Sequence, residues 1–240
     1  MNEIGAPFTL EGTHALVAGA GSPLARPAAV ALAEGGAVVS LFTQADDRTQ
    51  EVEAQSILNE CWSLGRDGQV CRLDSTDTAT VVAALDHLEA RVGPISVLVT
   101  VHPPVRHQFA AEATRLTWDA AIAYAATAVV VPNLAVGRRM LDRGGGRIVN
   151  VVSPLHEGRE PKTALFAASQ AAVLAFTYAL AVEWLPQRVI VQALVEDEAE
   201  VETSGRPHAH AELRKALRDL LLTDRNTPSV SHTGNMGSGA

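Results

Sequence analysis

Short apolar runs alternate with longer segments of helical spacing along almost the whole chain. The runs are rich in valine, leucine and alanine and have the lengths of buried strands, and the segments between them suit helices that cover a sheet. This alternation predicts an α/β fold with a doubly wound parallel sheet, in three layers. We expect strands at 14–19, 37–42, 69–73, 95–101, 147–152 and 189–195. We expect helices at 23–34, 46–64, 76–91, 118–141 and 162–184, and a last one near 212–222.

Two of the expected helices are apolar almost all round. No charged residue lies between Asp119 and Arg138, or between Lys162 and Glu183, so each segment is near the length of a membrane span. Both are diluted by alanine, and Pro132 interrupts the first, so we reject a membrane location. A helix that is apolar all round is buried somewhere, and we expect these two to be buried against another protein subunit.

Composition limits the alternatives further. A length of 240 residues suits a single domain, and a net charge of −8 argues against nucleic acid or an anionic membrane as a partner. Cys61 and Cys71 have no metal-like spacing and are interpreted as reduced thiols, and we predict no metal site. The first residues lack the pattern of a signal peptide, which favours a cytoplasmic location.

The most specific pattern lies in segment 147–184. A strand ends at Ser153, and Phe166 and Gln170 follow thirteen and seventeen residues later. The segment resembles the active-site region of the short-chain dehydrogenases/reductases, in which the serine is followed by a tyrosine and a lysine at these two spacings. The resemblance extends over nearly the whole chain, most firmly over 14–194. It implies a Rossmann-like fold in one domain, 1–240, with a substrate loop at about 196–211 and a Gly/Ser-rich tail at about 226–240.

The resemblance also implies that catalytic groups are missing. In the family, the tyrosine hydroxyl transfers the proton that accompanies hydride transfer, and the lysine lowers the tyrosine pKa and holds the nicotinamide ribose. Phe166 has no titratable proton, and the neutral Gln170 cannot depress the pKa of a neighbour. Aligning 118–128 with the family pattern places Ala125 where an asparagine is usual. Of the four catalytic positions only Ser153 is kept, so we expect no intact catalytic site.

The turn that would bind a dinucleotide phosphate is altered as well. Gly19 matches the first glycine of the family's turn, but the second and third positions hold Pro23 and Ala25. A proline has no N–H to offer to a phosphate. Ser22 and Pro23 also suit an N-cap followed by the first helical residue, which is a structural role.

Later positions of the cofactor cleft depart from the family pattern too. The second strand ends in 41–44 without an acidic residue, and His102 follows the fourth strand, either plugging the cleft or standing in a rigid loop. The run 196–202 begins with two carboxylates where the family has Pro-Gly, and these would repel a pyrophosphate unless the run is simply solvated. Asp74 matches the adenine-contacting aspartate. We therefore expect a vestigial site at Gly19 and Asp74 and no cofactor for this chain.

Other polar residues are interpreted as loop residues. A cluster of Ser153, His156 and Glu157 would suggest a hydrolase, but residues so close in sequence seldom form a triad, and a solvated loop is favoured. His208 and His210 are interpreted in the same way, rather than as metal ligands.

These observations lead to a functional hypothesis. We predict an inactive subunit that supports an active NAD-dependent member of the family, as a heterodimer or an α2β2 tetramer, and otherwise a homo-oligomer. The resemblance implies a hydroxyacyl-CoA-type dehydrogenase, such as that of the benzylsuccinate pathway of toluene degradation. The alternatives are an atypical oxidoreductase or cofactor-independent enzyme that uses Ser153, and a ligand-sensing protein. The expected interface residues are apolar: Tyr124, Leu134, Val173, Leu174, Phe176 and Leu180.

Overall fold

The computed structural model describes residues 9–101, 109–153, 162–196, 207–222 and 230–232. Over these residues the strands form one parallel sheet with the order β3-β2-β1-β4-β5-β6-β7. Six of them confirm predicted strands: β1 (His14–Ala18), β2 (Val38–Gln44), β3 (Val70–Leu73), β4 (Ile95–Val101), β5 (Gly146–Val152) and β6 (Val189–Val195). The seventh, β7 (Val230–His232), is too short to give a sequence signal.

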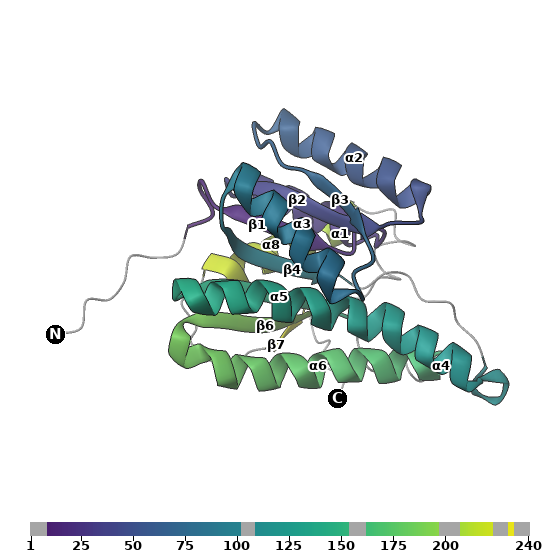
Figure 1. Ribbon diagram of the computed structural model, residues 1–240. Coiled ribbons are helices and arrows are strands. Elements are labelled where there is room, and N and C mark those ends of the chain that lie inside the picture. The colour runs from purple at the N-terminus through teal and green to yellow at the C-terminus, as the bar shows by residue number, and fades with distance from the viewer. Residues whose placement is uncertain (1–8, 102–108, 154–161, 197–206, 223–229, 233–240) are drawn as a thin grey trace, which may run out of the picture.

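Helices cover both faces of the sheet. They are α1 (Ala25–Glu34), α2 (Arg48–Ser63), α3 (Thr78–Val92), α4 (Arg115–Ile122), α5 (Ala128–Arg143), α6 (Ala164–Trp184) and α8 (Pro207–Leu222), with short turns at η1 (Ala110–Glu112), η2 (Ala123–Thr127) and η4 (Leu185–Gln187). Along β1, Ala15 and Val17 belong to the core under α1, α2 and α8, and Leu16 and Ala18 to the core under α3, α5 and α6. Figure 1 shows α3, α5 and α6 in front of the sheet and α1 and α8 behind it, which confirms the three-layer fold.

Local side chains set where the helices begin. The Asp47 side chain accepts hydrogen bonds from the backbone N–H groups of Thr49 and Gln50 at the start of α2. The predicted N-cap of the first helix lies slightly too early, because α1 begins at Ala25. Ser22 Oγ instead accepts from the Leu24 N–H at 3.2 Å, in a turn that precedes the helix.

Two helical stretches, Arg115–Arg143 and Ala164–Gln187, are long and apolar enough to cross a membrane by length and composition alone. In the structure they cover one face of the sheet, with α5 against β4 and β5 and α6 against β5 and β6. The two helices approach closely at Gly137, where a Cβ would overlap the ring of Trp184. Their apolar character is therefore explained in large part by packing inside the protomer.

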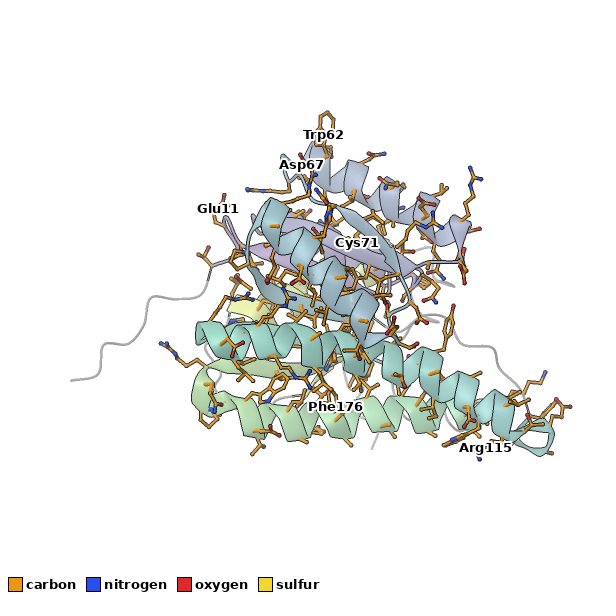
Figure 2. The ribbon with its side chains drawn as sticks, in the orientation of Figure 1. Glu11, Trp62, Asp67, Cys71, Arg115 and Phe176 are labelled. Carbon is orange, nitrogen blue, oxygen red and sulfur yellow. The ribbon has the colours of Figure 1, made fainter. Side chains whose placement is uncertain are left out.

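This packing corrects part of the predicted interface. Val173 and Leu180 are 1% and 5% exposed and face the core of their own protomer. Phe176 lies between α5 and α6, where it packs against the same core (Figure 2). Leu134 and Leu174 are half-buried. The alternation of the sequence could not separate the sheet-facing side of α6 from its outer side, because both sides are apolar.

A buried polar network fastens the sheet to α5 and α6. Asn150 Oδ1 accepts from Thr100 Oγ1 at 2.6 Å and from Asn133 Nδ2 at 2.9 Å. Asn150 Nδ2 donates to Asn133 Oδ1 at 3.0 Å and to Thr177 Oγ1 at 2.9 Å. All four residues are at most 2% exposed, so water cannot replace these bonds. The network joins β4, β5, α5 and α6 at one point.

Charged and polar groups join α3, α5 and the strands near the amino ends of β1 and β4. Glu89 of α3 pairs with Arg139 and Arg143 of α5 at 2.9 and 2.8 Å. Burial alone would raise the pKa of Glu89, but the hydrogen bonds from the Ile95 N–H and the two arginines outweigh it and hold that pKa below its ordinary value. His14 is buried between the Gly93 carbonyl and the Ser40 hydroxyl, and burial lowers its pKa.

The two cysteines form no disulfide. Cys61 is buried and Cys71 is half-buried. Burial raises the pKa of the Cys61 thiol to about 11, so this thiol is protonated at neutral pH.

We expect Asn150→Ala to lower the free energy of unfolding by about 3 kcal/mol, because three buried partners lose a hydrogen bond together. Urea denaturation measures this change. Asn59→Ala, on the exposed side of α2, is the matched control and should change the value by less than about 0.5 kcal/mol. If Asn150→Ala lowers the free energy of unfolding by less than about 1 kcal/mol, the network contributes little to stability.

Candidate functional site

The candidate site lies at the carboxyl ends of the central strands, where parallel sheets bind ligands. Ser153 directly follows β5, and Glu196 directly follows β6. The two strand ends are joined by a hydrogen bond from the Glu196 N–H to the Val152 carbonyl at 2.9 Å. Glu196 is 3% exposed, so at its first residue the acidic run is buried and not solvated.

Gln170 reaches this edge from the second turn of α6. Its Oε1 accepts a hydrogen bond from the Ser153 N–H at 3.1 Å. This donor fixes the amide orientation, because the opposite orientation would set two donors against each other. Gln170 Nε2 is buried and has no hydrogen-bond partner within the described part of the chain. An unpaired buried donor costs about 1–3 kcal/mol, so its position points to a ligand that supplies an acceptor.

The other two substituted positions lie on α6 itself and on η2, which packs against it. Phe166 is one turn earlier on the same side of α6 and is 7% exposed. Ala125 is fully buried in the π-turn η2, which packs against α6. A π-turn inside a helix often marks a functional site. Ser153, Phe166 and Gln170 are therefore gathered at one edge, and no tyrosine hydroxyl stands at position 166.

The glycine turn after β1 is held by backbone contacts. Gly19 has φ +102°, and a Cβ at this position would overlap the carbonyl oxygen of Val101 at the end of β4. The N–H groups of Gly19 and Ala20 both approach the Phe42 carbonyl, at 3.3 and 3.0 Å. Gly19 is thus required by the packing of three strand ends, whatever the turn binds.

A small hollow opens beside this turn. Its volume is about 20 Å³, which is room for one water molecule. Asp74 is not among its lining residues; its carboxylate accepts hydrogen bonds from the N–H and hydroxyl of Thr76 at 2.8 and 2.7 Å. No sequence pattern indicated that Gln50 and Ser75 line this hollow, and Tyr124 was expected at a subunit interface. The lining residues are Gly19, Phe42, Gln44, Gln50, Ser75, Val101, Tyr124 and Ala128.

Several predicted residues lie outside the described ranges. These include His102, His156, Glu157 and residues 197–202. His208 and His210 fall in the first turns of α8, where side chains are not described. Within the described ranges, no three His, Cys, Asp or Glu side chains are grouped as metal ligands.

The sequence profile of the short chain dehydrogenase family matches residues 13–204. The chain belongs to the short-chain dehydrogenase family. The matched range includes the strand ends, the glycine turn and α6, which form the edge described above.

Two relatives of the chain are named dehydrogenases. The chain is 32% identical over 182 residues to D-threitol dehydrogenase of Mycolicibacterium smegmatis, a match that covers 74% of this chain and 66% of that protein. It is 31% identical over 177 residues to gluconate 5-dehydrogenase of Gluconobacter oxydans, covering 74% of this chain and 67% of that protein. The match thus spans about two thirds of the length of these relatives.

Solved structures of other short-chain dehydrogenases share the fold. Gluconate 5-dehydrogenase of Burkholderia cenocepacia, in complex with NADP and tartrate, has a TM-score of 0.78 at 24% identity, over 95% of this chain and 96% of that chain. NAD+-bound xylitol dehydrogenase has a TM-score of 0.78 at 19% identity, over 95% of this chain and 100% of that chain.

These comparisons correct two predictions. The prediction of an inactive companion subunit is contradicted, because the relatives are named as dehydrogenases. The prediction that this chain takes no cofactor is contradicted by the NAD+ and NADP held in proteins of the same fold. The departures from the family pattern are side-chain substitutions, whereas a dinucleotide cradle is built largely from backbone turns and strand ends, which a side-chain substitution leaves in place.

We expect Gly19→Ala to lower the free energy of unfolding by about 2–4 kcal/mol, because the new Cβ meets backbone and the residue must keep a positive φ. Thermal or urea denaturation measures this. Gly65→Ala is the control, since φ is +79° there but no atom lies within 4 Å. The control should lose only about 1 kcal/mol. Equal losses for the two variants would show that the contact with Val101 is unimportant.

Proposed function

We propose that this protein is an atypical short-chain oxidoreductase that binds a nicotinamide dinucleotide and interconverts a hydroxyl and a carbonyl group of a small polyhydroxy compound. Its relatives D-threitol dehydrogenase and gluconate 5-dehydrogenase support this substrate class. The comparisons give no support to the predicted place in hydrocarbon degradation. The observation that carries the proposal is the unpaired donor Gln170 Nε2 beside Ser153.

The residues present suit a dinucleotide at the reacting end. The family's lysine contributes a donor for the nicotinamide ribose, and Gln170 keeps an uncharged N–H donor at that position. Gly19 keeps the turn after β1 close to the end of β4. When bound, the nicotinamide supplies or accepts a hydride. Gln170 Nε2 would then hold a ribose hydroxyl, while Oε1 keeps the Ser153 backbone in place.

The chain's own residues predict slow proton transfer. Ser153 offers the hydroxyl that orients the substrate oxygen, but a hydroxyl is a weak acid at neutral pH. Phe166 places an apolar ring where the family has its proton donor, so the proton must reach the substrate oxygen from solvent. The proposed enzyme therefore binds its cofactor and orients its substrate, but it lacks a tuned acid.

We expect the wild-type chain to bind NADH or NADPH, measured by nicotinamide fluorescence, and to oxidise threitol or gluconate slowly. Phe166→Tyr together with Gln170→Lys should raise turnover by about 100-fold or more, because a general acid and its pKa-lowering neighbour act together. If the cofactor cleft were empty, the same double substitution would leave turnover unchanged.

Single variants provide the control for this experiment. Phe166→Tyr alone should gain much less, since an unassisted tyrosine has a pKa near about 10. Absence of dinucleotide binding up to millimolar concentration would refute cofactor use. Binding without turnover in either the wild type or the double variant would refute the oxidoreductase activity.

We also propose that the outer side of α6 contacts a second copy of this chain. The side carries one exposed charge, Glu183 near its C-terminal end, and its other exposed residues are mostly alanine, which lets helices approach closely. A continuous exposed apolar surface favours association in a soluble protein. Its exposed members are Ala171, Ala172, Ala175, Tyr178, Ala179 and Val182.

The association is tested with Ala175→Asp, which should convert an oligomer into a folded monomer, because a buried unpaired carboxylate opposes the contact. Sedimentation velocity at micromolar concentration measures the state. Ala83→Asp, equally exposed on α3, should leave the oligomer unchanged. A monomeric wild type would exclude this contact.

A further inference from the structure

A buried carboxyl group lies at the candidate site and has no part in the binding steps described above. Glu196 directly follows β6 and is 3% exposed, although glutamate is seldom buried this fully. It is the only carboxyl among the side chains that the structure describes at this edge, which are those of Ser153, Phe166, Gln170 and Glu196. The edge therefore keeps one side chain that can carry a proton, at a position where the family pattern has none.

The strand register places Glu196 beside Ser153. Val152 and Val195 are the last paired residues of β5 and β6, and the serine and the glutamate follow them directly. The Glu196 N–H donates to the Val152 carbonyl at 2.9 Å, which continues the pairing beyond the last strand residues. Neighbouring strands lie about 4.8 Å apart, and residues in register share a face of the sheet. A substrate oxygen held at Ser153 therefore comes within reach of a side chain as long as glutamate.

The surroundings of these strand ends suit a carboxyl group that holds its proton. Val152 and Val195, which precede the serine and the glutamate, belong to an apolar cluster with Val173 of α6. Burial among apolar groups favours the neutral form of a carboxyl group. A neutral carboxyl can donate a proton, and it does not repel a pyrophosphate. The repulsion expected from the sequence requires the ionised form.

One other titratable residue is placed next to this edge by the sheet. His232 of β7 pairs in register with Val195. The first two turns of α6, residues 164–170, carry no charge. On α8, which also contacts β6, Leu213 belongs to the core and Arg214 pairs with Glu34 of α1. A titration observed at this edge can therefore be assigned by substituting two residues.

We propose that Glu196 carries the solvent proton to the substrate oxygen, in place of the hydroxyl that Phe166 lacks. The inference rests on the proposed oxidoreductase function and deepens it by naming the group that transfers the proton. When the substrate carbonyl is reduced, its carbon gains the hydride that the nicotinamide loses. The C=O π bond breaks, the oxygen takes the proton of Glu196, and the resulting carboxylate regains a proton from water. In the oxidation, the carboxylate takes the hydroxyl proton as the carbon gives up the hydride.

The first test compares turnover of threitol or gluconate by wild type, Glu196→Gln and Glu196→Asp. Glu196→Gln keeps the size of the side chain and removes its acidic proton, so kcat should fall by about 100-fold. The Kd of NADH, measured by nicotinamide fluorescence, should change by less than about 2-fold, because the proton carrier does not hold the cofactor. Glu196→Asp keeps the carboxyl group and should lose less activity. Glu212→Gln, on the exposed side of α8, is the control and should resemble wild type.

Two further measurements separate proton transfer from a structural role. Reduction needs the protonated carboxyl, so its rate should fall as the pH rises through the titration of Glu196, and the rate of oxidation should rise over the same range. Glu196→Gln should lose both trends, whereas His232→Gln should keep them. Infrared spectra of the protein without ligand provide a readout that does not depend on activity. The C=O band of a protonated carboxyl should disappear from the wild type as the pH rises and should be missing in Glu196→Gln.

The outcomes separate this inference from the proposed function. If wild type turns over a substrate and Glu196→Gln keeps its kcat or its pH trends, the role of Glu196 is overturned and the oxidoreductase activity stands. Loss of the trends in His232→Gln alone also overturns it. If Glu196→Gln does not fold, Glu196→Asp decides, because its infrared band should shift and its pH trends should persist, and an unchanged band overturns the inference. If wild type turns over neither substrate, the proposed function fails and the inference with it.

Discussion

Asn150 bonds to residues of β4, α5 and α6 from a position on β5 where water has no access. Each of its partners is itself buried, so a shift of either helix would leave polar atoms unpaired at a cost that apolar packing does not impose. Apolar contacts between alanine-rich helices and a sheet would tolerate some sliding. The hydrogen bonds fix the distance and rotation of α6, and all later features of the site depend on this.

The position of Gln170 illustrates that dependence. Thr177 bonds to Asn150, and Gln170 lies two turns earlier on the same helix, at the carboxyl edge of the sheet. With α6 fixed, the Gln170 amide meets the Ser153 N–H and leaves its second donor directed away from that bond. A buried donor without a partner is unfavourable in the free protein, and a ligand acceptor relieves this cost. Phe166 and Gln170 thus carry no titratable group, and Gln170 keeps a polar amide at this edge of the sheet.

The edge at Ser153 and the hollow beside the glycine turn differ in the groups that they expose to a ligand. At Ser153, Gln170 Nε2 has no hydrogen-bond partner among the described residues, whereas at the glycine turn Gln50 and Tyr124 line a hollow with room for one water molecule.

The sequence by itself determined the layered fold, because strand and helix periods follow from side-chain polarity along the chain, and six strands fall where the apolar runs are. It also determined that positions 166 and 170 hold a phenylalanine and a glutamine, and a phenylalanine cannot donate a proton in any fold. Tertiary structure decided which side of α6 is buried, because Val173 and Ala172 are alike in polarity and only packing against the sheet separates them. It decided as well that Gln50 fills the space over Gly21 and that Gln170 Nε2 meets no acceptor within the described ranges. These facts depend on contacts between residues distant in sequence, and a pattern along one chain does not contain them.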